Sequence, residues 1–103
     1  MLSEYDIEKA AELLVHDGVR KIVLFGSYAR GEASDTSDVD FLVVEENILS
    51  KVQEIMRLRR SVRSLRLPLD VMVASEQEVN DWGAIPGTAL YWALKEGKVL
   101  YEA

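Results

Sequence analysis

The chain has 103 residues, 49% of them apolar, and this length fits one small domain with one hydrophobic core. It contains no cysteine, which excludes disulfides and thiolate metal sites and is typical of a cytoplasmic protein. The formal net charge of −6 argues against nucleic acid as a direct partner, and the lack of a long apolar run argues against a membrane partner.

The N-terminal part of the chain predicts a helix followed by a buried strand. Ser3 resembles a helix N-cap. The apolar residues that recur behind it at helical spacing are Ile7, Ala10, Ala11, Leu14 and Val15. Gly18 is expected to end this helix, and His16 is expected to interact with the helix dipole there. The run KIVLFG, residues 21–26, then indicates a buried strand that ends at Gly26.

The rest of the chain predicts two more strands and three more helices. The strands are expected at DVDFLVVE (38–45) and LPLDVMVA (67–74), with a long amphipathic helix over 47–65 between them. Two short helices, EQEVNDW and TALYWALKEG, and an extended tail, KVLYE, follow. This order is typical of an α/β (α+β) protein with a small sheet. No linker divides the chain, so residues 1–103 are expected to form a single domain.

The long predicted helix is basic, although the protein as a whole is acidic. Between residues 51 and 66 the only acidic residue is Glu54. The basic residues of this segment are Lys51, Arg57, Arg59, Arg60, Arg63 and Arg66. Such a helix presents either a solvated face or a surface for a negatively charged partner, and the sequence leaves both open.

Three aspartates are expected to meet at one end of the sheet. Because side chains alternate along a strand, Asp38 and Asp40 point to one face, and the apolar residues between and after them enter the core. Asp70 interrupts the apolar third strand, where burial without a partner is unfavourable. If Asp70 lies beside Asp40, the carboxylates repel one another by about 4 kcal/mol per pair at about 4 Å. A divalent cation would compensate this repulsion, and oxygen-only ligands favour Mg²⁺ or Mn²⁺.

A Gly-Ser pair precedes these aspartates and suits the phosphates of a nucleotide. Gly26 ends a strand and lets the backbone approach a ligand closely, while Ser27 offers a hydroxyl and a backbone N–H at a helix start. Arg30 either adds positive charge to this turn or pairs with Glu32 or Asp35.

The stretch GSYARGEASDTSDVDF, residues 26–41, resembles the active-site signature of the nucleotidyltransferase superfamily that includes DNA polymerase β. The spacing is that of minimal nucleotidyltransferases, with Gly-Ser, ten residues and then Asp-x-Asp. Asp70 stands where the family has its third carboxylate, and KEGKVLYE is similar to the family's C-terminal tail. The resemblance implies a small mixed sheet flanked by helices, with the nucleotide bound between the Gly-Ser turn and the acidic strands.

The resemblance also implies a role for each site residue. Asp38 and Asp40 would hold two Mg²⁺ ions with the triphosphate of ATP, and Asp70 would complete the site that activates the attacking hydroxyl. The Gly-Ser turn would fix the terminal phosphates, with Arg30 as a further candidate for nucleotide binding. The implied reaction is Mg²⁺-dependent transfer of a nucleotide monophosphate from a triphosphate.

The acceptor follows only from the family. Minimal nucleotidyltransferases are often paired with HEPN-domain ribonuclease toxins, so the resemblance implies an antitoxin that forms a complex with such a toxin and transfers AMP to one of its tyrosines. One alternative is a non-catalytic antitoxin that only covers the toxin. Another is a nucleotidyltransferase that acts on RNA ends or on a small hydroxylated compound. The complete aspartate trio favours an enzyme, and the acidic charge and short chain argue against the last alternative.

Overall fold

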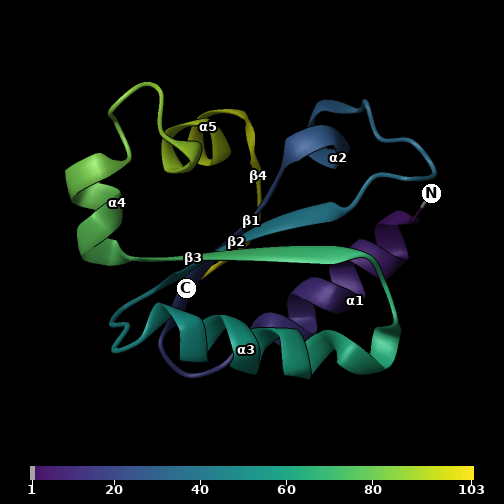
Figure 1. The fold of residues 1–103 in the computed structure, drawn as a ribbon, viewed down its shortest axis with the longest axis horizontal. Helices are drawn as coiled ribbons and strands as arrows, with labels where there is room; N and C mark the ends of the chain where they lie inside the picture. The colour runs from purple at the N-terminus through teal and green to yellow at the C-terminus, as the bar shows by residue number, and fades with distance from the viewer. Residues whose placement is uncertain (1) are drawn as a thin grey trace.

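The computed structural model describes residues 2–103 and shows a four-stranded mixed sheet with helices on both faces (Figure 1). The strands are β1 (Val19–Phe25), β2 (Val39–Glu45), β3 (Leu69–Ser75) and β4 (Lys98–Glu102). The helices are α1 (Glu4–Leu14), α2 (Gly26–Arg30), α3 (Lys51–Val62), α4 (Glu76–Trp82) and α5 (Ala89–Glu96), and a 3-10 turn over Arg63–Leu65 extends α3. The predicted α/β class with a small mixed sheet is confirmed.

The strand order in the sheet is β3-β2-β1-β4. Strand β2 pairs antiparallel with β1 and parallel with β3, and β4 pairs antiparallel with the other side of β1. A parallel neighbour requires a crossover connection, and α3 provides it between β2 and β3. As a result, the end of β1 and the beginnings of β2 and β3 lie together at the same end of the sheet.

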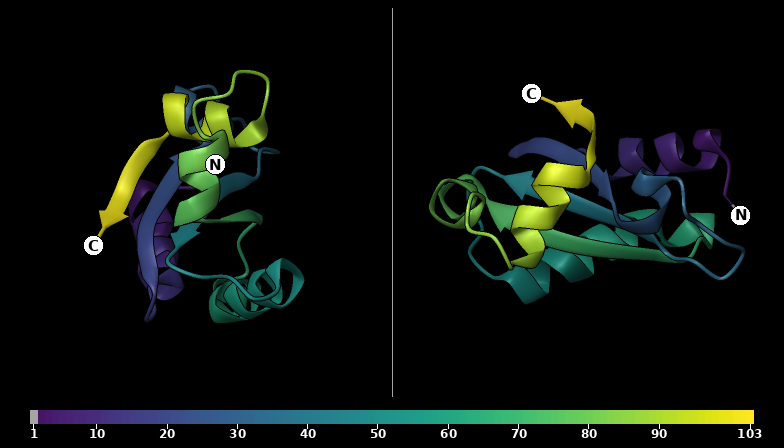
Figure 2. Two further views of the ribbon diagram at one scale, coloured as in Figure 1. Left: turned by 90° about the vertical axis from the view of Figure 1, so that its left-hand side faces the viewer. Right: turned by 90° about the horizontal axis from the view of Figure 1, so that it is seen from above.

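The hydrophobic core occupies both faces of the sheet, and β2 contributes to each. Val39, Phe41 and Val43 pack with apolar side chains of α1 and α3 on one face, as their alternation predicted. Leu42 and Val44 pack on the opposite face with residues that include a buried alanine of α5. Figures 1 and 2 show α1 and α3 on one side of the sheet and α5 on the other. The central strand is therefore covered by helices on both sides.

Local hydrogen bonds explain where the helices begin, and they correct two predicted boundaries. The Ser3 hydroxyl and the Asp6 side chain form the reciprocal bonds of a capping box at the start of α1, which confirms the predicted N-cap. Helix α1 ends at Leu14, before Gly18, and Gly18 instead turns the chain with φ of 92°. Helix α3 begins after Ser50, later than predicted, because the Ser50 hydroxyl accepts a bond from the third backbone N–H of the helix.

The helix start expected at Ser27 is the short helix α2, which the segment GSYAR forms directly after β1. The segment KVLYE, expected as an extended tail, is a fourth strand of the sheet. Strand β4 completes the sheet beside β1 through backbone hydrogen bonds. Within residues 2–103, the structure contains no helix that is both long enough and apolar enough to cross a membrane.

Candidate functional site

The three predicted aspartates lie where β1 ends and where β2 and β3 begin. Asp40 is paired in register with Phe25 of β1 on one side and with Asp70 of β3 on the other. Because register partners on adjacent strands, about 4.8 Å apart, point to the same face, the Asp40 and Asp70 side chains are neighbours. Asp38 precedes β2 by one residue. The structure thus confirms that Asp70 lies beside Asp40 on the neighbouring strand.

Burial and the charges of its neighbours act together on the pKa of Asp40. Partial burial raises the pKa of Asp40 above its ordinary value, and the charges of Asp70 and Asp38 raise it further. The positive charge of Arg30 acts in the opposite direction on the same pKa. The site therefore disfavours its own negative charge and favours a cation among these oxygens.

Gly26 brings the turn after β1 into direct contact with this acidic group. Its φ is +73°, a left-handed conformation that glycine adopts readily. A β-carbon at this position would lie only 2.2 Å from Oδ2 of Asp40. The Asp40 carboxylate therefore rests against the bare α-carbon of Gly26, and a larger residue there would have to displace it. Ser27 follows in the first turn of α2 and is partly exposed.

Two arginines add positive charge beside the aspartates. Nε of Arg30 lies 3.6 Å from Oε2 of Glu32, so Arg30 pairs with Glu32 and also influences Asp40. On the other side of the site, the Arg59 guanidinium of α3 lies 3.4 Å from Oδ1 of Asp70. Sequence reasoning did not single out Arg59 as a site residue, although it lies in the basic segment that was noted there.

The environment of Asp70 differs from the expectation. The sequence predicted a carboxylate enclosed by apolar neighbours, but 54% of the Asp70 side chain is exposed. The reason is that β3 is an edge strand, so the first residues of this apolar run reach solvent. Because Asp70 reaches solvent, burial does not force it to find a compensating partner. Its relation to Asp40 rests on the strand register.

The basic helix is used partly within the protein. Lys51 pairs with Glu78, and Arg57 contacts Glu54 in addition to the Arg59 pair described above. The side chains of the remaining three basic residues of this segment form no ion pair with any residue that the structure describes; these are Arg60, Arg63 and Arg66. Both interpretations, a solvated face or a surface for a negatively charged partner, stay open for these three arginines.

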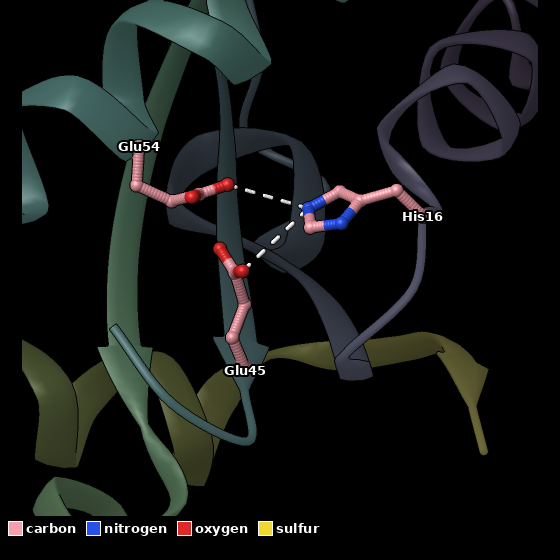
Figure 3. A group of neighbouring side chains, drawn as sticks. All are labelled: His16, Glu45 and Glu54. Atoms are coloured by element: carbon pink, nitrogen blue, oxygen red, sulfur yellow. Dashed lines mark ion pairs between the residues drawn. The ribbon is translucent and has the colours of Figure 1, made fainter. Parts of the chain in front are cut away.

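A second polar cluster lies at the opposite end of β2 (Figure 3). Nε2 of His16 is 3.5 Å from Oε1 of Glu45 and 3.3 Å from Oε1 of Glu54. The expected interaction of His16 with the end of α1 is therefore wrong, because its ring faces these carboxylates. Sequence reasoning missed the cluster. The available signal was Glu45, a carboxylate that directly continues the apolar run of a central, fully covered strand.

Glu45→Gln is expected to stabilise the metal-free protein above about pH 7 and to remove a pH dependence. Burial, followed by repulsion from Glu54, raises the pKa of Glu45 from 4.5 to about 7, while Arg57 lowers it. Between these values the folded state holds a proton that the unfolded state releases. The free energy of unfolding of the wild type should therefore fall as the pH rises through this range, by up to about 3 kcal/mol.

Urea denaturation in the presence of EDTA, repeated from about pH 5 to pH 8, measures this effect. Glu46→Gln is the matched control, because Glu46 is the exposed next residue and pairs with Arg20. The control should keep the wild-type dependence of the free energy of unfolding on pH. If the Glu45→Gln variant also kept this dependence, the raised pKa of Glu45 would not be its cause.

Comparison with known proteins identifies the family of this fold and site. Residues 8–103 match the model of the family described as "Polymerase beta, Nucleotidyltransferase", so the chain belongs to this nucleotidyltransferase family. The chain is similar to the protein adenylyltransferase MntA of Thermococcus cleftensis, with 47% identity over 60 residues. That match covers 56% of this chain and 61% of the MntA protein. The chain thus matches less than two thirds of that relative's length.

A longer match links the chain to a putative protein adenylyltransferase of Methanocaldococcus jannaschii, with 31% identity over 88 residues, 81% of this chain and 79% of that protein. The structure is also similar to a chain in a complex of tri-AMPylated Shewanella oneidensis HEPN toxin with MNT antitoxin. The TM-score is 0.60 at 16% identity, and the match covers 99% of this chain and 74% of the other. At this identity the likeness shows a shared fold.

Proposed function

We propose that this protein is a cytoplasmic antitoxin that transfers AMP from ATP to a tyrosine hydroxyl of a partner HEPN toxin and thereby neutralises it. The observation that supports the proposal is the register pairing of Asp40 with Asp70 beside the bare α-carbon of Gly26. Asp38 precedes β2 by one residue, and its charge also raises the pKa of Asp40. The names of the similar proteins support the acceptor, since they include protein adenylyltransferases and a complex of an AMPylated HEPN toxin with its antitoxin.

The donor atoms of the aspartate trio fit Mg²⁺. All of them are carboxylate oxygens, and the raised pKa of Asp40 reflects a repulsion that a divalent cation would relieve. Asp38, Asp40 and Asp70 would hold two such ions together with the triphosphate. When bound, magnesium would lower the pKa of the attacking hydroxyl and neutralise the pyrophosphate that leaves.

The side chains around the trio position the reactants. The Gly-Ser turn would receive the terminal phosphates at its backbone N–H groups and the Ser27 hydroxyl, and Arg30 would add positive charge there. The tyrosine oxygen attacks the α-phosphorus of ATP, the bond from this phosphorus to the bridging oxygen breaks, and pyrophosphate leaves. The carboxylate of Asp70 accepts the phenolic proton. Arg59 balances the charge of Asp70 before the ligands arrive.

Residues 1–103 act in this proposal as a single minimal nucleotidyltransferase domain. In this proposal the partner toxin supplies the acceptor hydroxyl and its own docking surface. The reaction then takes place within a hetero-oligomer of antitoxin and toxin. This arrangement assigns recognition of the acceptor to contacts between the two proteins.

The purified protein, mixed with the HEPN protein encoded next to it, ATP and Mg²⁺, is expected to add AMP to that partner. Intact-mass spectrometry of the partner measures the adenylyl groups, and tandem mass spectrometry locates the modified tyrosine. Replacing Mg²⁺ by EDTA, or ATP by an analogue with a methylene bridge between the α- and β-phosphates, should abolish the mass increase. A partner that is inhibited without any mass increase would instead support an antitoxin that only covers its toxin.

A further inference from the structure

We propose that His16, Glu45 and Glu54 form a second metal site, which binds one transition-metal ion such as Zn²⁺ at the end of β2 remote from the aspartate trio. Figure 3 shows that the three side chains point toward one another. They come from the connection between α1 and β1, from the last residue of β2 and from the first turn of α3. Binding there is independent of nucleotidyl transfer.

The distances between the ligand atoms suit a tetrahedral ion. Nε2 of His16 lies 3.5 Å from Oε1 of Glu45 and 3.3 Å from Oε1 of Glu54, and one ligand atom from each residue lies within 4.8 Å of the others. Around Zn²⁺ with ligands at about 2.0 to 2.1 Å, the atoms of neighbouring ligands are roughly 3.4 Å apart. The protein therefore already holds two edges of such a tetrahedron at the required length.

A buried and unpaired oxygen points to a cation at this place. Glu45 is only 3% exposed, and its Oε2 has no hydrogen-bond partner among the residues that the structure describes. A buried polar atom without a partner is unfavourable and needs a reason. Its side chain is directed into the cluster, and a cavity of about 380 Å³ is lined by His16, Glu45 and Glu54. This cavity can admit an ion and a water molecule as fourth ligand.

Arg57 takes the place of the ion in the metal-free protein. A terminal nitrogen of its guanidinium lies 2.8 Å from Nε2 of His16, contacts Oε1 of Glu54 and is 4.0 Å from Oε1 of Glu45. Arg57 carries one positive charge, whereas a divalent ion carries two, one for each carboxylate. The Arg57 side chain is 51% exposed and can move into solvent. Metal and Arg57 therefore compete for the same position.

The two sites should select different ions. An imidazole nitrogen with two carboxylates suits Zn²⁺ or Co²⁺, whereas the aspartate trio offers only the hard oxygen ligands that Mg²⁺ prefers. An ion held by His16, Glu45 and Glu54 would also join three separate segments of the chain. It would then act as a structural crosslink on the α1 and α3 face of the sheet, away from the face to which Asp40 points.

Titration with Co²⁺ in excess Mg²⁺ tests the proposal, because tetrahedral Co²⁺ has intense visible absorption bands. We expect one Co²⁺ per chain, displaced by Zn²⁺. His16 is the only histidine of the sequence, so its ring ¹⁵N signals can be followed in the wild type. With Zn²⁺, the resonance of one ring nitrogen should shift to the range of a metal-bound imidazole, while Mg²⁺ alone should leave it unchanged.

Variants separate this site from the aspartate trio. Asp38→Asn with Asp40→Asn should leave the Co²⁺ bands intact, whereas His16→Gln should weaken binding by at least about a hundredfold. Arg57→Gln should tighten metal binding by about two- to fivefold, because it removes the competing guanidinium, and this factor corresponds to the free energy of a half-exposed ion pair. Circular dichroism confirms that each variant is folded. The proposal is wrong if Zn²⁺ leaves the ring ¹⁵N signals of wild-type His16 unchanged. It is also wrong if the double aspartate variant loses the Co²⁺ absorption bands while His16→Gln keeps them.

Discussion

Replacing Asp38 and Asp40 together by Asn is expected to reduce AMP transfer by about a thousandfold while raising the melting temperature of the metal-free protein. The loss of activity corresponds to about 4 kcal/mol of transition-state stabilisation, the order of magnitude that a bound metal ion supplies. The gain in stability follows because the pKa of Asp40 is raised by burial and by its two neighbouring carboxylates. Neutral side chains remove both unfavourable effects.

Single-turnover transfer to the toxin measures the first effect, and thermal denaturation in EDTA measures the second. Asp81→Asn is a suitable control, since Asp81 is an exposed carboxylate of α4 whose side chain contacts Gln77. It should change neither quantity. A double variant that transfers AMP at the wild-type rate would refute the catalytic assignment. One that is inactive but less stable would show that the carboxylates serve the fold as well.

Gly26→Ala is expected to lower the melting temperature by roughly 10 to 20 °C and to abolish AMP transfer. The added β-carbon would overlap Oδ2 of Asp40 at 2.2 Å, which forces either the turn or the carboxylate to move. The left-handed backbone costs an alanine about 1 kcal/mol, and overpacking adds about 1 to 3 kcal/mol. Differential scanning calorimetry and the transfer assay measure the two effects.

Gly31→Ala provides a matched control for this substitution. Gly31 has the same φ of +73°, but a β-carbon there would meet no atom within 4 Å. It should therefore show only the backbone effect of about 1 kcal/mol and retain activity. If both variants lower the melting temperature equally and transfer AMP at the same rate, the contact between Gly26 and Asp40 is not needed for activity.

Much of the layered fold could be predicted because hydrophobic periodicity reports burial. Strand β2 alternates between two covered faces, and the capping box at Ser3 marks the start of α1. The boundaries of α3 were less predictable, since the choice of Ser50 as N-cap depends on one side-chain hydrogen bond. Strand β4 was missed because its three consecutive apolar residues, Val99, Leu100 and Tyr101, are too short a run to distinguish a strand from an extended tail.

The candidate site was predictable in its residues but not in all its contacts. Motif spacing placed Asp38 and Asp40 together, and the register of β2 with β3 brought Asp70 beside them. The exposure of Asp70 and its pairing with Arg59 depend on β3 being an edge strand, which is a property of the sheet order. Long-range contacts of this kind leave no periodic signal in the chain. The cluster around His16 was missed for the same reason.

Strand β2 also keeps two charged regions apart, the aspartates around Asp40 and the cluster around Glu45. Asp40 and Glu45 are five positions apart, so they lie at opposite ends of the strand and face opposite sides of the sheet. Five residues of extended chain span about 17 Å, roughly twice the screening length at physiological salt. A substitution that changes the charge at one end of β2 is therefore expected to have little effect on the pKa values at the other end.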